Sequence, residues 1–215
     1  MNERGMVNVD QLMNNAGSEN MQTGAVPPQL SHGGHEMFDV SEILSGAINA
    51  LNLYTILKPH VKDPELLDMM NRHEQFMITE YNTIVECFQT GMKPSVSTEV
   101  YNMKQGNDFV FGLKQTPPMK PMMMPEEIND QVISDLMLGS VKSNASLKGM
   151  ATTEVSNPVV RRVLADTIPN CIEMAYEISI YQNKHHYYQV PQLPAGDMQQ
   201  MVNSYAPAQS KNLSN

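Results

Sequence analysis

The feature that most constrains the fold of this chain is a row of mostly apolar side chains that recurs every three or four residues. The row runs from residue 66 to residue 88, with no Gly or Pro inside it. Its members are Leu66, Met70, His73, Met77, Tyr81, Ile84 and Phe88. Steps of three and four place side chains on one face of an α-helix, as in the seam of a helix bundle. Asp63-Pro64-Glu65 is typical of a helix start and Gly91 of a helix end, so the sequence predicts a helix between them.

The pattern of this helix returns 94 residues later in the chain. Val61-Lys-Asp-Pro64 corresponds to Val155-Ser-Asn-Pro158. The apolar row corresponds to Val160, Leu164, Thr167, Cys171, Ala175 and Ile178. A further helix is predicted before each of the two, the first ending at Leu57 and the other running from about Glu126 to Met150. Two helical hairpins joined by a long connection are the layout of a ferritin-like four-helix bundle.

These signals divide the chain into a bundle with an arm at each end. The predicted fold class is all-α, with a ferritin-like four-helix bundle over residues 38–190. Its parts are a first hairpin (38–91), a crossover linker (92–125) and a second hairpin (126–190). Residues 1–37 are polar and are predicted to be a flexible arm. Residues 191–215 are predicted to be a flexible tail, too polar and broken for a helix of its own.

Composition and motifs exclude several function classes. The chain has 14 Lys and Arg against 23 Asp and Glu, and this net charge of -9 argues against nucleic-acid binding. It has no run of 18 apolar residues and no apolar signal-peptide region near Met1, so we expect no membrane span and synthesis inside a cell. Motifs of serine hydrolases, zinc proteases, phosphate-binding loops and dinucleotide-binding folds are absent from the sequence. We therefore expect no catalytic residue and no cofactor.

A ferritin-like prediction raises the question of a metal site. Di-iron bundles use a Glu from each of two helices and a Glu-x-x-His pair from each of the other two. His73 lies on the inward row, but Met70 stands three residues before it, and the repeat partner of His73 is Thr167. His73 is either a hydrogen-bonded core histidine or the residue of a degenerate metal site that Glu74 and Glu80 could join. The first interpretation is favoured, and no metal is expected.

Two features of the predicted core leave alternatives open. Cys87 and Cys171 lie in different helices without CxxC spacing, which favours two free thiols, although a disulfide is not excluded. Small residues in the third helix either let helices approach closely or leave room for a small ligand. They are Gly139, Ser140, Ser143 and Ala145.

The second hairpin has Ser156-Asn-Pro-x-x-Arg161 between its two helices and ends in the exit Tyr187-Tyr-Gln-Val-Pro191. With these motifs, the stretch from about Asp130 to Leu193 resembles the Coat F domain of spore-forming bacteria. The first hairpin looks like a diverged copy, and the Met-rich, Trp-free composition is similar to that group. The resemblance implies a ferritin-like fold and an association with endospores, in the coat or another layer. It implies no enzymatic residue.

The function that these observations predict is a non-enzymatic structural or assembly protein of bacterial endospores. Its expected partners are other spore proteins, and a homodimer is the default oligomer. Four tyrosines near the C-terminal end could take part in packing or oxidative cross-linking: Tyr181, Tyr187, Tyr188 and Tyr205. The alternative is a ferritin-like metal-binding protein or oxidase with a degenerate site around His73.

Overall fold

The computed structural model describes residues 26–104, 106 and 108–208, and this part of the chain has five α-helices and no β-strand. The helices are α2 (Gly34–Leu57), α3 (Pro64–Thr90), α4 (Asp130–Ala151), α5 (Pro158–Lys184) and α6 (Ala195–Val202). Short 3-10 turns lie at Pro28–Leu30 (η1), Lys58–His60 (η2) and Pro125–Glu127 (η3). The prediction of an all-α chain is confirmed.

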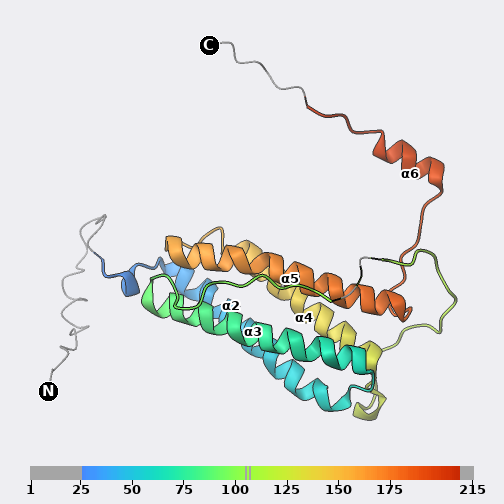
Figure 1. Cartoon of the computed structure of the whole chain (residues 1–215), viewed down its shortest axis with the longest axis horizontal. Helices are drawn as coiled ribbons and strands as arrows, with labels where there is room; N and C mark the ends of the chain where they lie inside the picture. The colour runs from blue at the N-terminus through green and yellow to red at the C-terminus, as the bar shows by residue number, and fades with distance from the viewer. Residues whose placement is uncertain (1–25, 105, 107, 209–215) are drawn as a thin grey trace.

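Helices α2 to α5 pack side by side as a bundle (Figure 1). Helix α2 packs against α3 and α4, and α5 packs against the same two helices. Contacts from the start of α3 reach the end of α5, and contacts from the end of α3 reach the start of α5, so these two helices are antiparallel. The crossover between α3 and α4 therefore runs the length of the bundle.

The starts of α3 and α5 are set by the two predicted Xaa-Pro pairs. The Asp63 carboxylate accepts a hydrogen bond from the Glu65 N–H at 2.8 Å, and the Asn157 side-chain oxygen accepts one from the Val159 N–H at 2.9 Å. These acceptors satisfy amides that have no partner inside the helix. Helix α3 ends at Gly91, whose φ of 64° lies in the left-handed region. A Cβ at this position would lie 1.8 Å from the Pro28 carbonyl oxygen. Glycine is therefore required both by the backbone conformation and by the lack of space for a side chain.

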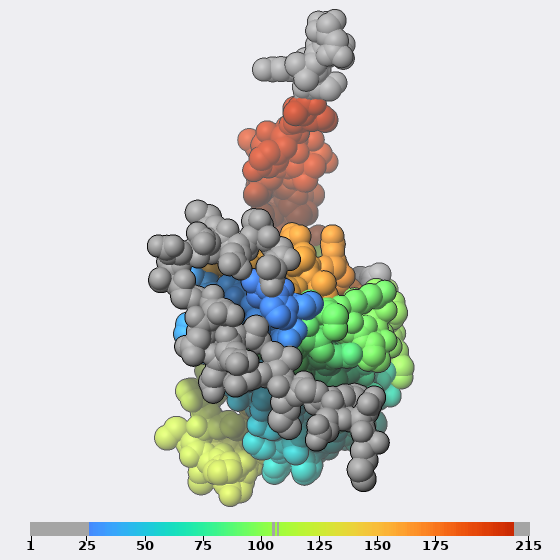
Figure 2. Space-filling model, turned by 90° about the vertical axis from the view of Figure 1, so that its left-hand side faces the viewer, coloured from blue at the N-terminus to red at the C-terminus, as the bar shows by residue number. Residues whose placement is uncertain are grey.

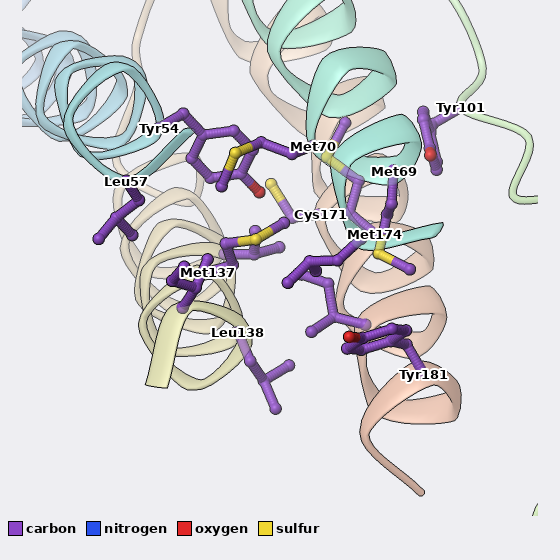
Figure 3. Packing of buried hydrophobic residues seen from close by; sticks show 14 residues of the cluster. Tyr54, Leu57, Met69, Met70, Tyr101, Met137, Leu138, Cys171, Met174 and Tyr181 are labelled. Atoms are coloured by element: carbon purple, nitrogen blue, oxygen red, sulfur yellow. The ribbon is translucent and has the colours of Figure 1, made fainter. Parts of the chain in front are cut away.

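The core between the four helices is rich in methionine and tyrosine (Figure 3). Its largest fully buried side chains include Tyr54, Met69, Met70, Met137 and Tyr181. Burying each large apolar side chain contributes about 1.5–3 kcal/mol, so this core is the main source of the bundle's stability.

The crossover is held against α5 by a row of buried polar side chains about two helical turns apart, Asn170, Glu177 and Asn183. Each accepts a hydrogen bond from a crossover amide: Tyr101 N–H to Asn170 (3.0 Å), Lys104 N–H to Glu177 (2.9 Å) and Val110 N–H to Asn183 (2.7 Å). Beyond them, Phe111 and Val190 form an isolated parallel bridge. The long connection is therefore anchored at regular intervals along one helix.

Two boundaries differ from those predicted. Helix α2 begins at Gly34, inside the predicted arm, because the Glu36 carboxylate anchors its first turn to the α4–α5 connection. Helix α6 forms in the tail, where no helix was predicted, but none of its residues is buried and it stands away from the bundle (Figures 1 and 2). The rest of the predicted arm and tail, residues 1–25 and 209–215, lies outside the described residues.

Helix α2 with η2 (Gly34–His60) is also long and apolar enough to cross a membrane, by length and composition alone. The sequence criterion missed it because its apolar residues are interrupted by Ser and Asn. In the structure the face that carries Ile43, Ala50 and Tyr54 is buried against the rest of the bundle.

Candidate functional site: a polar network inside the bundle

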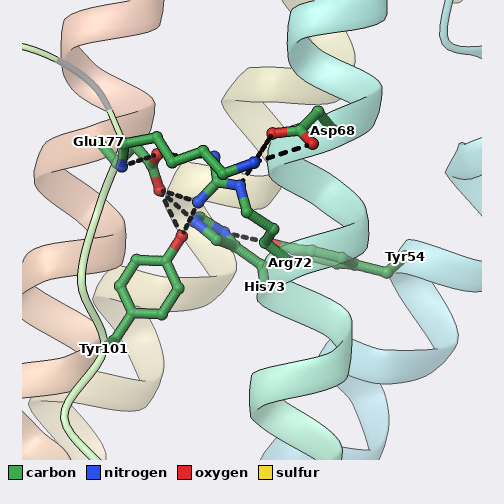
Figure 4. Close-up of polar contacts among 7 residues, drawn as sticks. Tyr54, Asp68, Arg72, His73, Tyr101 and Glu177 are labelled. Atoms are coloured by element: carbon green, nitrogen blue, oxygen red, sulfur yellow. Dashed lines mark hydrogen bonds and ion pairs between the residues drawn. The ribbon is translucent and has the colours of Figure 1, made fainter.

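His73 lies on the inward face of α3 and is fully buried between two other helices (Figure 4). Its Nδ1 atom lies 3.1 Å from the Tyr54 hydroxyl of α2, and its Nε2 atom lies 3.0 Å from the Glu177 carboxylate of α5. The prediction of an inward, hydrogen-bonded histidine is confirmed. One imidazole thus joins three helices.

Glu177 is the centre of this network. Its side chain is fully buried and accepts a hydrogen bond from His73, two from the Arg72 guanidinium at 2.7 and 3.2 Å, one from the Tyr101 hydroxyl and one from the Lys104 N–H. A buried carboxylate is tolerated only when it is paired and hydrogen-bonded in this way. The donors come from α3 and from the crossover, so Glu177 fixes both to α5.

The protonation states follow from the hydrogen bonds. Burial and the nearby Glu177 charge raise the pKa of Tyr54, so its hydroxyl stays protonated and donates to Nδ1 of His73. Nε2 of His73 then carries the ring proton and donates to Glu177. Burial lowers the pKa of His73 and outweighs the hydrogen bond and the charge of Glu177, which act to raise it. Burial alone would raise the pKa of Glu177, but the hydrogen bonds from His73, Arg72, Tyr101 and Lys104 outweigh it and lower this pKa. The site therefore holds a neutral histidine beside an ionised carboxylate.

The residues predicted as weak metal candidates are not brought together. Glu74 forms an ion pair with Lys58, and Glu80 forms one with Lys148. Neither carboxylate contacts His73, and Arg72 covers both oxygens of Glu177. Within the described part of the chain, no group of three or more His, Cys, Asp and Glu side chains is placed to hold a metal ion.

Lys148 and Glu80 form a second polar cluster, near the middle of the bundle. The side chain of Lys148 is 4% exposed and that of Glu80 is 12% exposed. Burial would lower the pKa of Lys148, but the Glu80 charge outweighs it and raises this pKa. The Asn170 amide also donates to Glu80, at 3.2 Å, and the Cys171 sulfur lies 3.6 Å from the ammonium. Burial raises the pKa of Cys171, which keeps it a thiol.

The core cavity beside this cluster has a volume of about 30 Å³. Pockets for organic ligands measure about 300–1,000 Å³, so this space suits water at most. Gly139 and Ser143, which were considered as lining for a ligand pocket, are instead exposed on the outer face of α4. Cys87 and Cys171 are both buried and free, as the favoured interpretation predicted.

Acidic residues at the starts of α2 and α4 each bind the connection of the other hairpin. The buried Glu36 carboxylate accepts from the Ser156 N–H at 2.9 Å, the Ser156 hydroxyl at 2.6 Å and the Asn157 N–H at 3.0 Å. The Asp130 carboxylate accepts from the Lys62 N–H at 2.9 Å. The two hairpins therefore anchor each other at opposite ends of the bundle.

We predict that thermal stability falls as the pH is lowered from 7 to 5. The pKa of His73 lies below its ordinary value of 6.5 in the folded chain, so below pH 6.5 the unfolded chain binds the proton first. The lowered pKa of Glu177 adds a further loss below its ordinary value of 4.5. Calorimetric melting at pH 7.5, 6, 5 and 4 measures this fall. His73→Gln should flatten the change between pH 7 and 5, whereas His60→Gln, at an exposed histidine, should not. A melting temperature that rises from pH 7 to 5 would contradict the assignment of His73.

The structure is thus that of an all-helical bundle protein whose interior polar groups hydrogen-bond to one another across three helices and a crossover. Comparison with known proteins identifies its family. The Coat F domain family matches residues 129–191. The spore coat protein F-like protein YhcQ of Bacillus subtilis (strain 168) is 49% identical over 179 residues, 83% of this chain and 82% of that protein. The chain belongs to the spore coat protein F family.

A solved structure has the same fold. The crystal structure of a candidate spore coat protein from Bacillus halodurans C-125 matches with a TM-score of 0.55 at 15% identity. The match covers 79% of this chain and 99% of that chain. At this identity the likeness concerns the fold alone.

Proposed function

We propose that this chain is a non-enzymatic structural or assembly protein of the bacterial spore, located in the coat. The observation that carries the proposal is the 49% identity to a spore coat protein F-like protein over most of both chains. The buried network supports it, because its donors and acceptors satisfy one another and its central carboxylate, Glu177, is enclosed. Such a network stabilises a scaffold and presents no reactive group to a substrate.

We also propose that the bundle is ferritin-like and arose from a repeated hairpin. The support comes from pairs of residues 94 positions apart that have the same role. Asp63 and Asn157 cap their helices, Glu36 and Asp130 accept from the opposite connection, and Lys62 and Ser156 donate to them. Equivalent hydrogen bonds at both ends of the bundle are expected if two copies of a hairpin pack around an approximate two-fold axis.

The metal-binding alternative has less support. A di-iron bundle needs carboxylates that are free to bind the metal from four helices. Here Glu177 is bound by the Arg72 guanidinium and Glu80 by the Lys148 ammonium. A cation in either place would have to displace a protein cation that is already paired.

The exposed parts of the chain suit contacts with other spore proteins. Apolar side chains are exposed along the crossover, at Val100, Leu113, Met119 and Met123. Tyr205 is 87% exposed and Tyr188 is 46% exposed, so both can reach a neighbouring molecule or an oxidant. Tyr181, which was expected near the exposed end, is instead fully buried and donates to Asp63, so it is excluded from cross-linking.

The test is to locate the chain in spores. We expect a fluorescent fusion, expressed in a sporulating bacterium from the promoter of a coat gene, to form a ring at the spore surface. We expect the untagged chain to be extracted with the coat proteins by alkaline detergent, while a cytosolic marker protein stays with the core. Recovery of the chain with the core marker, or only in the mother-cell lysate, would overturn the proposed location.

A further inference from the structure

The side of α2 that faces away from the bundle has few charged residues for a surface exposed to water. From Ile43 to Leu57 the helix has no charged residue. Of the 18 consecutive residues that are most apolar in this helix, only 28% are buried in the bundle. Much of an apolar helix therefore faces outward. One exposed stripe follows this surface at steps of three and four: Phe38, Glu42, Ser45, Asn49, Asn52 and Ile56.

A matching stripe runs along α4, the neighbour of α2. Its exposed members are Leu136, Gly139, Ser143, Ser146 and Met150. Each lies 94 residues after a member of the α2 stripe, from Glu42 to Ile56. The helices meet at Gly46, where a Cβ would lie 3.1 Å from the Asn144 side chain. Asn49 and Ser143 stand beside this contact line, so the stripes form one continuous surface. We call it the α2–α4 face.

We propose that two copies of this chain associate through the α2–α4 face around a two-fold axis. The face carries one charged side chain, Glu42, on a chain of net charge -9. A two-fold contact places a surface against itself, so like charges on most faces of this acidic chain would oppose the contact. The α2–α4 face avoids that repulsion and supplies apolar anchors at both ends, Ile56 and Met150.

The size of the face suits a stable dimer. Helix α2 has 24 residues, and a helix of that length is about 36 Å long. Two adjacent helices about 10 Å apart present a strip about 20 Å wide. Such a strip offers about 700 Å² per copy, close to the ~800 Å² per partner of a standard interface. This inference does not depend on a role in the spore.

The first experiment measures the mass of the full chain in solution. Sedimentation velocity or light scattering should give a dimer, twice the chain mass of 24.1 kDa. Ile56→Glu should weaken self-association at least tenfold. Its matched control is Ile172→Glu on α5, because Ile56 is 65% exposed and Ile172 is 60% exposed and both changes add one negative charge. The control should leave the dimer unchanged.

A second variant maps the face without weakening it. Ser143→Cys lies near the centre of the face, so mild oxidation should link two copies through this position. Asn71→Cys, exposed on α3, should remain unlinked. The native Cys87 and Cys171 are buried and should not contribute. A monomeric wild-type chain, equal effects of Ile56→Glu and Ile172→Glu, or cross-linking at Asn71→Cys alone would overturn the proposal.

Discussion

Replacing Glu177 with alanine should lower the melting temperature of the chain by about 10 °C at pH 7. The change removes the acceptor of five hydrogen bonds, leaves the buried His73 without its acceptor and leaves the half-buried Arg72 with Asp68 as its remaining carboxylate partner. Breaking a buried ion pair on one side costs about 3–5 kcal/mol. In a chain of this size each kcal/mol shifts the melting temperature by about 2–4 °C. Thermal unfolding followed by circular dichroism measures the shift.

Two further variants make this result specific. Asp166→Ala removes an exposed carboxylate from the same helix, whose contact with Arg162 is 3.8 Å long, and should change the melting temperature by less than about 2 °C. Glu177→Gln keeps the shape and one acceptor oxygen, so its loss should fall between the two. If Glu177→Ala were as stable as Asp166→Ala, the network would not contribute to stability.

Replacing Lys148 with methionine should destabilise the chain by about 3 kcal/mol, because it leaves Glu80 buried without a cation. The sharper prediction concerns the double variant. Adding Glu80→Gln to Lys148→Met removes the unpaired charge and keeps an acceptor for Asn170. The double variant should therefore recover about 1–2 kcal/mol of the loss. Denaturant unfolding of the wild type, both single variants and the double variant gives this coupling directly.

Lys142→Met is the matched control on α4, because Lys142 is exposed and has no carboxylate partner within ion-pair distance in the described residues. It should change the stability by less than about 0.5 kcal/mol. A double variant less stable than Lys148→Met alone would mean that Glu80 contributes through contacts other than its charge.

The elements of the bundle were predictable because their signals are local. Asp63-Pro64 and Asn157-Pro158 were assigned as helix starts and form the N-caps of α3 and α5. The inward position of His73 followed from its place in a row with Leu66 and Ile84. The start of α2 at Gly34 was missed because its first turn is held by Ser156, a residue 120 positions away from Glu36. No local pattern encodes such a contact.

Glu177 was missed for a geometric reason. The internal repeat pairs His73 with Thr167, but α3 and α5 are antiparallel. A residue near the start of α3 therefore meets one near the end of α5, ten residues beyond Thr167. The repeat partners of His73 and Glu177 are Thr167 and Thr83, both buried. The spacing of Glu177 does indicate its position. It lies three residues after Met174 and four before Tyr181, which places it on the inward side of α5.

The dependence of the first hairpin on the second has a consequence for synthesis on the ribosome. The polypeptide leaves the ribosome from its N-terminus, and domains fold as their parts emerge. Glu36, Arg72 and His73 are made early, yet their partners Ser156, Asn157 and Glu177 follow about 100 residues later. The inward side of the nascent first hairpin therefore faces water, and native packing waits until α5 has emerged. Premature arrest within the crossover would release a fragment with an open apolar face, which is a substrate for chaperones and proteases.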